Sequence, residues 1–157
     1  VLYWAYQPLC HQLPERSFFI GGPRAVYTLE QLATSLGHMP AQRFTGNAQL
    51  GYKIAFCQRD VATYGGWLVF GLVFALGRKR IRPLPWPWVI ALIVPMAVDG
   101  LLQLLGVIMS NPERRVITGL LFALGTAWFA YPHVQKGMVE AQAIARQSLE
   151  SVRHADS

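Results

Sequence analysis

Two short segments combine a cysteine with polar and charged residues. LCHQLPERSFF, residues 9–19, places Cys10 beside His11, and FCQRDVATYGG, residues 56–66, places Cys57 near Asp60. A zinc ion needs about four N, S or O ligands, and these four side chains are the candidates. However, the side chains of adjacent residues diverge, and the spacing matches none of the common zinc patterns. We therefore predict no metal site, with Cys10, His11 and Cys57 as the residual candidates.

The two cysteines have two other interpretations, which depend on the compartment they face. On an oxidising face, a Cys10–Cys57 disulfide is chemically permitted and would tie a long loop to the first apolar segment. Alternatively, both thiols are reduced and inert. The Cα separation that a disulfide requires does not follow from the sequence, so both interpretations stay open.

Asp99 is the most informative single residue, because it lies near the middle of the longest apolar run. A carboxylate at that depth of a membrane costs about 2.5–3.5 kcal/mol on insertion scales. Gln103 and Ser110 follow at helical spacing, so one face of this helix is polar toward its outer end. This face is either a proton or ion path or an outward-opening pocket, or Asp99 is a structural residue that hydrogen-bonds a neighbouring helix.

Basic residues near the same interface are the expected partners of Asp99, and one polar cluster pairing Arg59 or Arg16 with Asp99 and Gln103 is our hypothesis. The full candidate set is Arg16, Arg59, Asp60, Asp99, Gln103, Ser110, Arg114 and Arg115. No glycine-rich phosphate loop, nucleophile elbow or HExxH motif occurs, and we predict that the protein is not an enzyme. The apolar segments contain no histidine, so we expect no cofactor to be ligated by this chain within the membrane; other cofactors are unknown.

The composition indicates that membrane helices position these residues. Only 14% of the residues are charged and 53% are hydrophobic, whereas about 25% are charged in a typical globular protein. The net charge is +6, but no Lys/Arg run is interleaved with aromatic residues, so we expect no nucleic-acid partner. Loops that meet anionic lipid headgroups account for the positive balance.

About 20 largely apolar residues cross a hydrocarbon core as a helix. Three segments are candidates for such spans, at 54–76, 86–109 and 116–131. The segment VLYWAYQ at 1–7 is too short to span; it is either the end of a further, incomplete helix, which we favour, or a processed terminus that lies at the interface. The sequence thus predicts an all-α integral membrane protein, with one domain over 1–157. It has three transmembrane helices, or four with the incomplete one, and a C-terminal amphipathic helix.

Basic loops predict the orientation in a prokaryotic cytoplasmic membrane. The short loop at 77–85 carries several Lys/Arg residues and is expected to be cytoplasmic, together with the tail at 132–157. The loop region at 9–53, with Cys10 and Cys57, is then outside. Within it, TLEQLATSLG predicts a short helix with Thr28 as N-cap, Gln31 in a capping box and Gly37 as its stop. SNPERR predicts a helix that begins at Pro112.

Two helix faces are predicted to pack against other helices. Gly119, Ala123 and Ala127 recur at four-residue spacing, which lets two membrane helices approach closely. In the tail, an apolar stripe recurs at helical spacing: Val134, Met138, Ala141, Ala145, Leu149 and Val152. Mixed charges elsewhere on the tail argue against a purely lipid-binding helix, so we expect it to dock on a partner or on the chain's own loops.

Three blocks resemble the signature blocks of a family of small bacterial and archaeal predicted multi-pass membrane proteins of unknown function. They are CHQLPERSFF, CQRDVATYGG and PMAVDGLLQLLGVIMSNPERRVITGLLF, in this order between residues 9 and 125. The resemblance implies a helical multi-pass membrane protein and implies no reaction. The chain has Asp60 where family members often have a second cysteine, Ile108 where they often have arginine, and a longer link between the first two blocks. The missing thiolate weakens a metal site.

These observations together predict a non-enzymatic accessory or scaffolding subunit of a larger membrane complex, for instance a photosynthetic or respiratory, energy-transducing one. Its expected partners are the lipid bilayer and other membrane subunits. The alternative is a small transporter or an ion- or proton-binding membrane protein that uses Asp99. A membrane thiol or metal enzyme is the third class.

Overall fold

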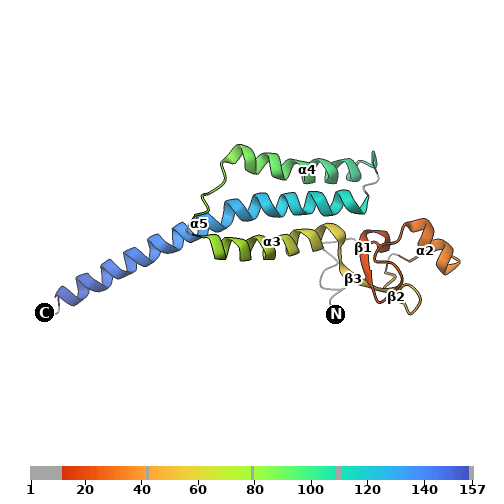
Figure 1. Cartoon of the computed structure of the whole chain (residues 1–157), viewed down its shortest axis with the longest axis horizontal. Coiled ribbons are helices and arrows are strands. Elements are labelled where there is room, and N and C mark those ends of the chain that lie inside the picture. Colours follow the sequence, from red (N-terminus) through yellow and green to blue (C-terminus); the bar gives the residue numbers. More distant parts are fainter. Residues whose placement is uncertain (1–11, 42, 79, 109–110, 156–157) are drawn as a thin grey trace.

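The computed structural model describes residues 12–41, 43–78, 80–108 and 111–155. Three long helices run side by side, and a small sheet with one short helix lies at one end of them (Figure 1). We call this end of the helices the sheet end and the opposite end the tail end. The predicted fold class is confirmed, because the protein is mostly helical and three helices have the length and composition to cross a membrane. The small sheet was not predicted.

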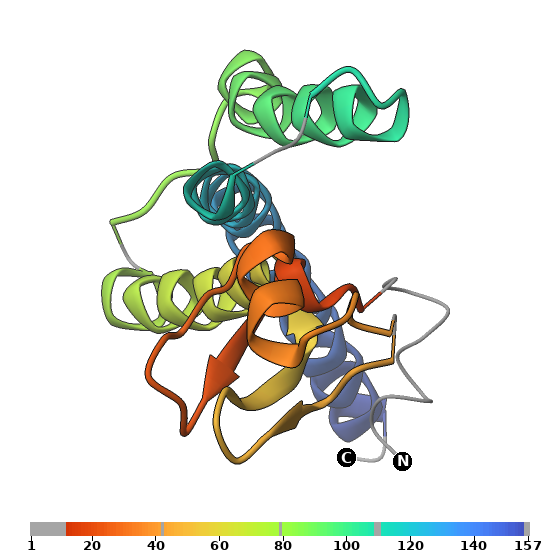
Figure 2. The ribbon, with the colours of Figure 1, turned by 90° about the vertical axis from the view of Figure 1, so that its right-hand side faces the viewer.

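The long helices are α3 (Gln58–Gly77), α4 (Trp86–Leu104) and α5 (Pro112–Ala155). With 20 and 19 residues, α3 and α4 are each about 30 Å long, which matches the hydrocarbon core of a bilayer. Both pack against α5, which is the central helix. The end-on view in Figure 2 shows α3 and α4 on different sides of α5.

The observed bounds of the spans differ from the predicted ones. The first helix begins at Gln58 rather than at residue 54, because the preceding residues belong to a strand, and the second ends at Leu104 rather than at 109. The third does not end at 131, because α5 continues through Pro132. A proline removes one helical hydrogen bond and kinks a helix, but the residues that follow are mostly good helix formers. The predicted tail is therefore the continuation of a transmembrane helix.

Part of the predicted loop region at 9–53 forms a short sheet together with the residues that follow it, up to Cys57. Strands β1 (Ser17–Ile20), β2 (Gly46–Asn47) and β3 (Gly51–Cys57) form an antiparallel sheet of order β1-β3-β2, and a 3₁₀ turn, η1 (Pro14–Arg16), precedes β1. Two of these strands are too short to show an alternating pattern, and β3 runs directly into an apolar helix. A small core lies under the sheet, made of Phe19, Tyr27, Leu32 and Leu50.

Two predicted helix starts are confirmed. Helix α2 (Leu29–Leu36) follows Thr28, whose side chain accepts a hydrogen bond from the Gln31 backbone while Gln31 caps in return. Gly37 ends this helix with a φ of +72°, in the left-handed region that favours glycine. Helix α5 begins at Pro112, as predicted.

The small-residue stripe of α5 lies against α3. Ala123 and Ala127 are buried. A Cβ atom added to Gly119 would lie 2.8 Å from the backbone oxygen of Arg59, and one added to Gly66 would lie 2.6 Å from the Ala123 Cβ. The backbones of α3 and α5 are therefore in close contact only because these positions carry no larger side chain.

Candidate functional site

An ion pair joins α3 to α4 at the sheet end. The Arg59 Nη2 group donates to the Asp99 Oδ2 atom, and the Gln103 Nε2 group donates to the same oxygen over 2.8 Å. The side chains of Arg59 and Asp99 are 18% and 14% exposed. Asp99 and Gln103 share one face because they are four residues apart on a helix. The structure thus brings together Arg59, Asp99 and Gln103, and the arginine that reaches Asp99 is Arg59 rather than Arg16.

The depth of Asp99 differs from the prediction. Since α4 ends at Leu104, Asp99 lies five residues, or about 7.5 Å along the axis, from the end of its helix. Arg59 is the second residue of α3. The ion pair therefore lies near the sheet end of the spans rather than in mid-membrane. At this depth the cost of holding charges is lower, because headgroups and water are close.

A second, buried polar chain connects the sheet to the helices. The Arg115 Nη1 group donates to the Gln58 Oε1 atom over 3.4 Å, and the Gln58 Nε2 group donates to the Ser17 backbone oxygen over 3.3 Å. Gln58 and Ser17 are fully buried, and Arg115 is 7% exposed. Gln58 therefore links β1 to α5. Reasoning from the sequence missed this residue, although a glutamine at the start of an apolar helix was a usable signal.

Positive charge is concentrated around Arg115. Arg115 is buried, and the positive charges of Arg16 and Arg59 lie close enough to act on it, while the negative charge of Glu15 acts in the opposite direction. Among the described residues, the buried Nε atoms of Arg59 and Arg115 have no hydrogen-bond partner. A buried donor without a partner costs about 1–3 kcal/mol. Acceptors of the described residues thus compensate this group of basic side chains only in part.

The remaining predicted site residues do not join this cluster or lie outside the described residues. Within the described ranges, no hydrogen bond or ion pair involves the side chains of Asp60 and Arg114. Asp60 lies in the first turn of α3, where a carboxylate complements the helix dipole. Cys10, His11 and Ser110 lie outside the described residues, so the Cys10–Cys57 disulfide stays a prediction. Within the part that the structure describes, no group of three His, Cys, Asp or Glu side chains is placed to hold a metal ion.

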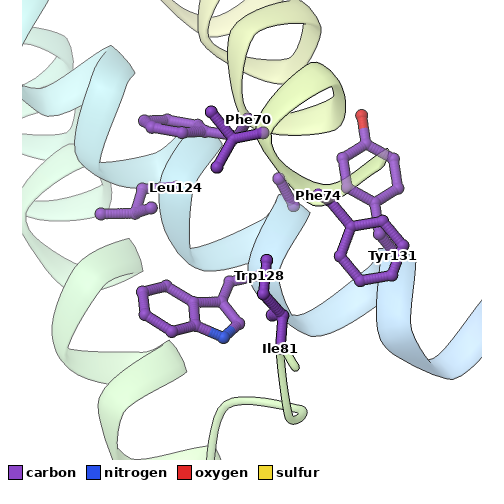
Figure 3. A pocket seen from close by; sticks show the side chains of 8 residues that line it. Phe70, Phe74, Ile81, Leu124, Trp128 and Tyr131 are labelled. Atoms are coloured by element: carbon purple, nitrogen blue, oxygen red, sulfur yellow. The ribbon is translucent and has the colours of Figure 1, made fainter. Parts of the chain in front are cut away.

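A cavity of about 290 Å³ lies nearer the tail end, between α3, α5 and the loop that follows α3. Figure 3 shows its aromatic and aliphatic lining, which includes Phe70, Phe74, Ile81, Leu124, Trp128 and Tyr131. The two polar groups of this lining are already used. The Trp128 Nε1 group donates to the Arg82 backbone oxygen and the Tyr131 hydroxyl donates to the Trp67 backbone oxygen, each over 3.0 Å. The cavity therefore suits a hydrocarbon group, and its described polar side chains are already bonded within the chain rather than placed to bind a polar substrate.

Comparisons with known proteins identify relatives but no activity. Residues 47–129 match the family described as "Predicted membrane protein (DUF2085)". The chain is also similar to "Uncharacterized protein MJ1492" of Methanocaldococcus jannaschii, with 33% identity over 134 residues that cover 83% of this chain and 67% of the relative. No solved structure matches the chain. The family resemblance expected from the three sequence blocks is confirmed.

Proposed function

We propose, from the premise that the chain belongs to the DUF2085 family of predicted membrane proteins, that it is a non-enzymatic accessory or scaffolding subunit of a larger membrane complex. The observation that carries this proposal is the part of α5 that extends beyond the other helices. Figure 1 shows this extension running far past the ends of α3 and α4.

The extension is long enough to reach a partner outside the bilayer. Helix α5 has 44 residues, whereas about 20 residues cross a hydrocarbon core. About half of α5, or roughly 30 Å, therefore projects from the membrane. In the predicted orientation, this half lies in the cytoplasm.

The apolar stripe of the extension points away from the rest of the chain. Gln135, Lys136 and Val139 line a shallow, open hollow beside the loop that follows α3, so this side of α5 is the one nearer to the rest of the chain, although Val139 is itself 57% exposed. Val134, Met138 and Leu149 lie on the opposite side and are 59%, 60% and 72% exposed. An apolar stripe that projects into water on an isolated helix is unfavourable. A partner that covers it removes this cost.

The partner we propose is a helix of another membrane subunit. The side of the extension opposite the stripe carries both signs of charge, on Lys136, Glu140, Arg146 and Glu150. Helices that lie on anionic lipid are usually rich in Lys and Arg on this side. An amphipathic helix docking its apolar face on another helix or groove needs no such bias. Photosynthetic and respiratory complexes are the first class to search for this partner.

Two matched variants of the extension test the proposal in native membranes. V134Q/M138Q/L149Q removes three apolar side chains of the stripe, and K136Q/E140Q/E150Q removes three of the four charges on the other side, with the same number of changes. After mild solubilisation, native electrophoresis should show the chain in a complex much larger than itself, unchanged in the second variant and lost in the first. A partner-free monomer in the wild type, or equal loss in both variants, would count against the proposal.

One substitution distinguishes this proposal from the alternative, a transporter or ion-binding protein that uses Asp99. Both donors converge on one oxygen of Asp99, an arrangement that suits a link between helices. Asp99→Asn should abolish flux if Asp99 carries an ion or proton, whereas the scaffolding proposal expects only a change in stability. Ion-flux measurements in proteoliposomes distinguish the two.

A further inference from the structure

A second cavity, of about 450 Å³, opens between α3 and α4 at the sheet end. Its walls include Met96, Ala97 and Leu101 of α4 and Phe122 of α5, and its single charged lining residue among those described is Arg59. The cavity thus combines a hydrocarbon surface with one guanidinium group. The tail-end cavity has no such group.

The position of the cation matches the headgroup layer. Arg59 lies at the first turn of α3, and the cavity lining reaches Leu104, the last residue of α4. Because α3 and α4 each match the thickness of the hydrocarbon core, their ends lie where acyl chains give way to phosphates. The apolar wall, from Leu101 back to Ile93, runs from this level toward the membrane centre.

Arg59 has N–H donors left over with which to bind an anion. The Asp99 Oδ2 atom already accepts from both Arg59 and Gln103, and one ion pair uses only part of a guanidinium that has five N–H donors. The Arg59 Nη1 atom lies on the cavity side, 3.5 Å from the position of a Cβ atom added to Gly100, which is a lining residue. Arg115 is close enough to Arg59 for their positive charges to act on each other. The Asp99 carboxylate is therefore covered by donors, while the arginines have donors in excess.

We propose that this cavity binds a phospholipid with an anionic headgroup. Its phosphate pairs with Arg59, and one acyl chain lies along Met96, Ala97 and Leu101. The bound lipid would hold together two helices that pack mainly on α5 rather than on each other. This inference does not depend on the docking of the α5 extension.

Thermal unfolding of the purified full chain in detergent tests the proposal. Phosphatidylglycerol is titrated against phosphatidylcholine and against inorganic phosphate. We expect phosphatidylglycerol to raise the Tm at the lowest concentration, and phosphatidylcholine and inorganic phosphate to have little effect. Equal stabilisation by phosphatidylcholine would show that the headgroup is not recognised. Equal stabilisation by inorganic phosphate would show a soluble-anion site instead. Either result overturns the proposal.

Three variants locate the site. R59Q/D99N removes the cation together with its partner, so no lone charge is left, and Ala97→Trp fills the exposed wall while the ion pair stays. Each should raise the phosphatidylglycerol concentration needed for the same rise in Tm by about tenfold, which corresponds to the loss of about one charge-assisted hydrogen bond. Arg80→Gln, in the loop after α3, is the control and should not change it.

Two results would overturn the location. One is an unchanged phosphatidylglycerol effect in Ala97→Trp, which remains informative even if R59Q/D99N fails to fold. The other is efficient disulfide formation between two copies of an Ala97→Cys variant in membranes, because the cavity would then be a protein interface.

Discussion

The two ends of the helical bundle are built in different ways. At the sheet end, charged and amide side chains join β1, α3, α4 and α5, through the Arg59–Asp99 ion pair and the Arg115–Gln58–Ser17 chain. At the tail end, aromatic residues and two hydrogen bonds to backbone oxygens hold α3, α5 and the loop after α3. Beyond that, α5 continues alone.

This difference indicates a division of roles. The polar contacts of the sheet end lie within the chain and fix how the three helices are placed. On the extension beyond the tail end, apolar side chains are exposed, which suits contact with another molecule. Changes at the sheet end should therefore affect stability, and changes on the extension should affect assembly.

The largest effect on stability is expected for Asp99→Ala. This change leaves the Arg59 guanidinium unpaired in a largely apolar setting, and breaking such a pair costs about 3 kcal/mol. Chemical unfolding in detergent measures the loss. R59Q/D99N should lose less, because no uncompensated charge remains. Equal losses in both variants would show that the charge itself does not matter.

Gly66→Ala is expected to destabilise the α3–α5 contact by about 1–3 kcal/mol, through overpacking against Ala123. Gly65 is the matched control, because a Cβ atom added there meets nothing within 4 Å. Gly65→Ala should be neutral or slightly stabilising, since alanine favours helices. Similar unfolding curves for the two variants would contradict the close helix contact.

Gln58→Ala is expected to cost about 1–2 kcal/mol, because it leaves Arg115 and the Ser17 carbonyl without their buried partner. Hydrogen exchange should show faster exchange in β1, where the link to the helices is lost. Gln49→Ala, at an exposed position, is the control. Unchanged exchange in β1 would mean that the sheet is held by its own core alone.

The smallest effect is expected at the tail end. Trp128→Phe removes the hydrogen bond to the Arg82 backbone oxygen. We expect it to lower the free energy of unfolding by about 1 kcal/mol or less, because Trp128 is 42% exposed. Trp88→Phe, at a 65% exposed position, is the control. A loss as large as that of Asp99→Ala would contradict the difference between the two ends.

Patterns that span several residues were predictable from the sequence. The three apolar runs gave the spans, and Thr28, Gln31 and Gly37 gave the bounds of α2, because capping depends on residues close in sequence. The pairing of Arg59 with Asp99 could also be anticipated, since a charge inside an apolar helix requires a partner.

Other features depend on contacts between distant residues and were not predictable. The pairing of β1 with β3 joins residues 32 to 40 positions apart, and β1 is too short to show alternation. The role of Gln58 likewise depends on Ser17 and Arg115 meeting it in space. The amphipathic helix expected at 132–157 is continuous with the third span, because a single proline does not stop a helix whose flanking residues favour it.

Photo-crosslinking along α5 in native membranes tests the central claim most directly. A photoreactive amino acid is placed at Met138 or Leu149 on the stripe, and at Lys136 or Glu150 on the opposite side. The account predicts one discrete protein adduct of the same size from both stripe positions and little from the other two. Adducts of equal yield from both sides, or no protein adduct from the stripe, would contradict it.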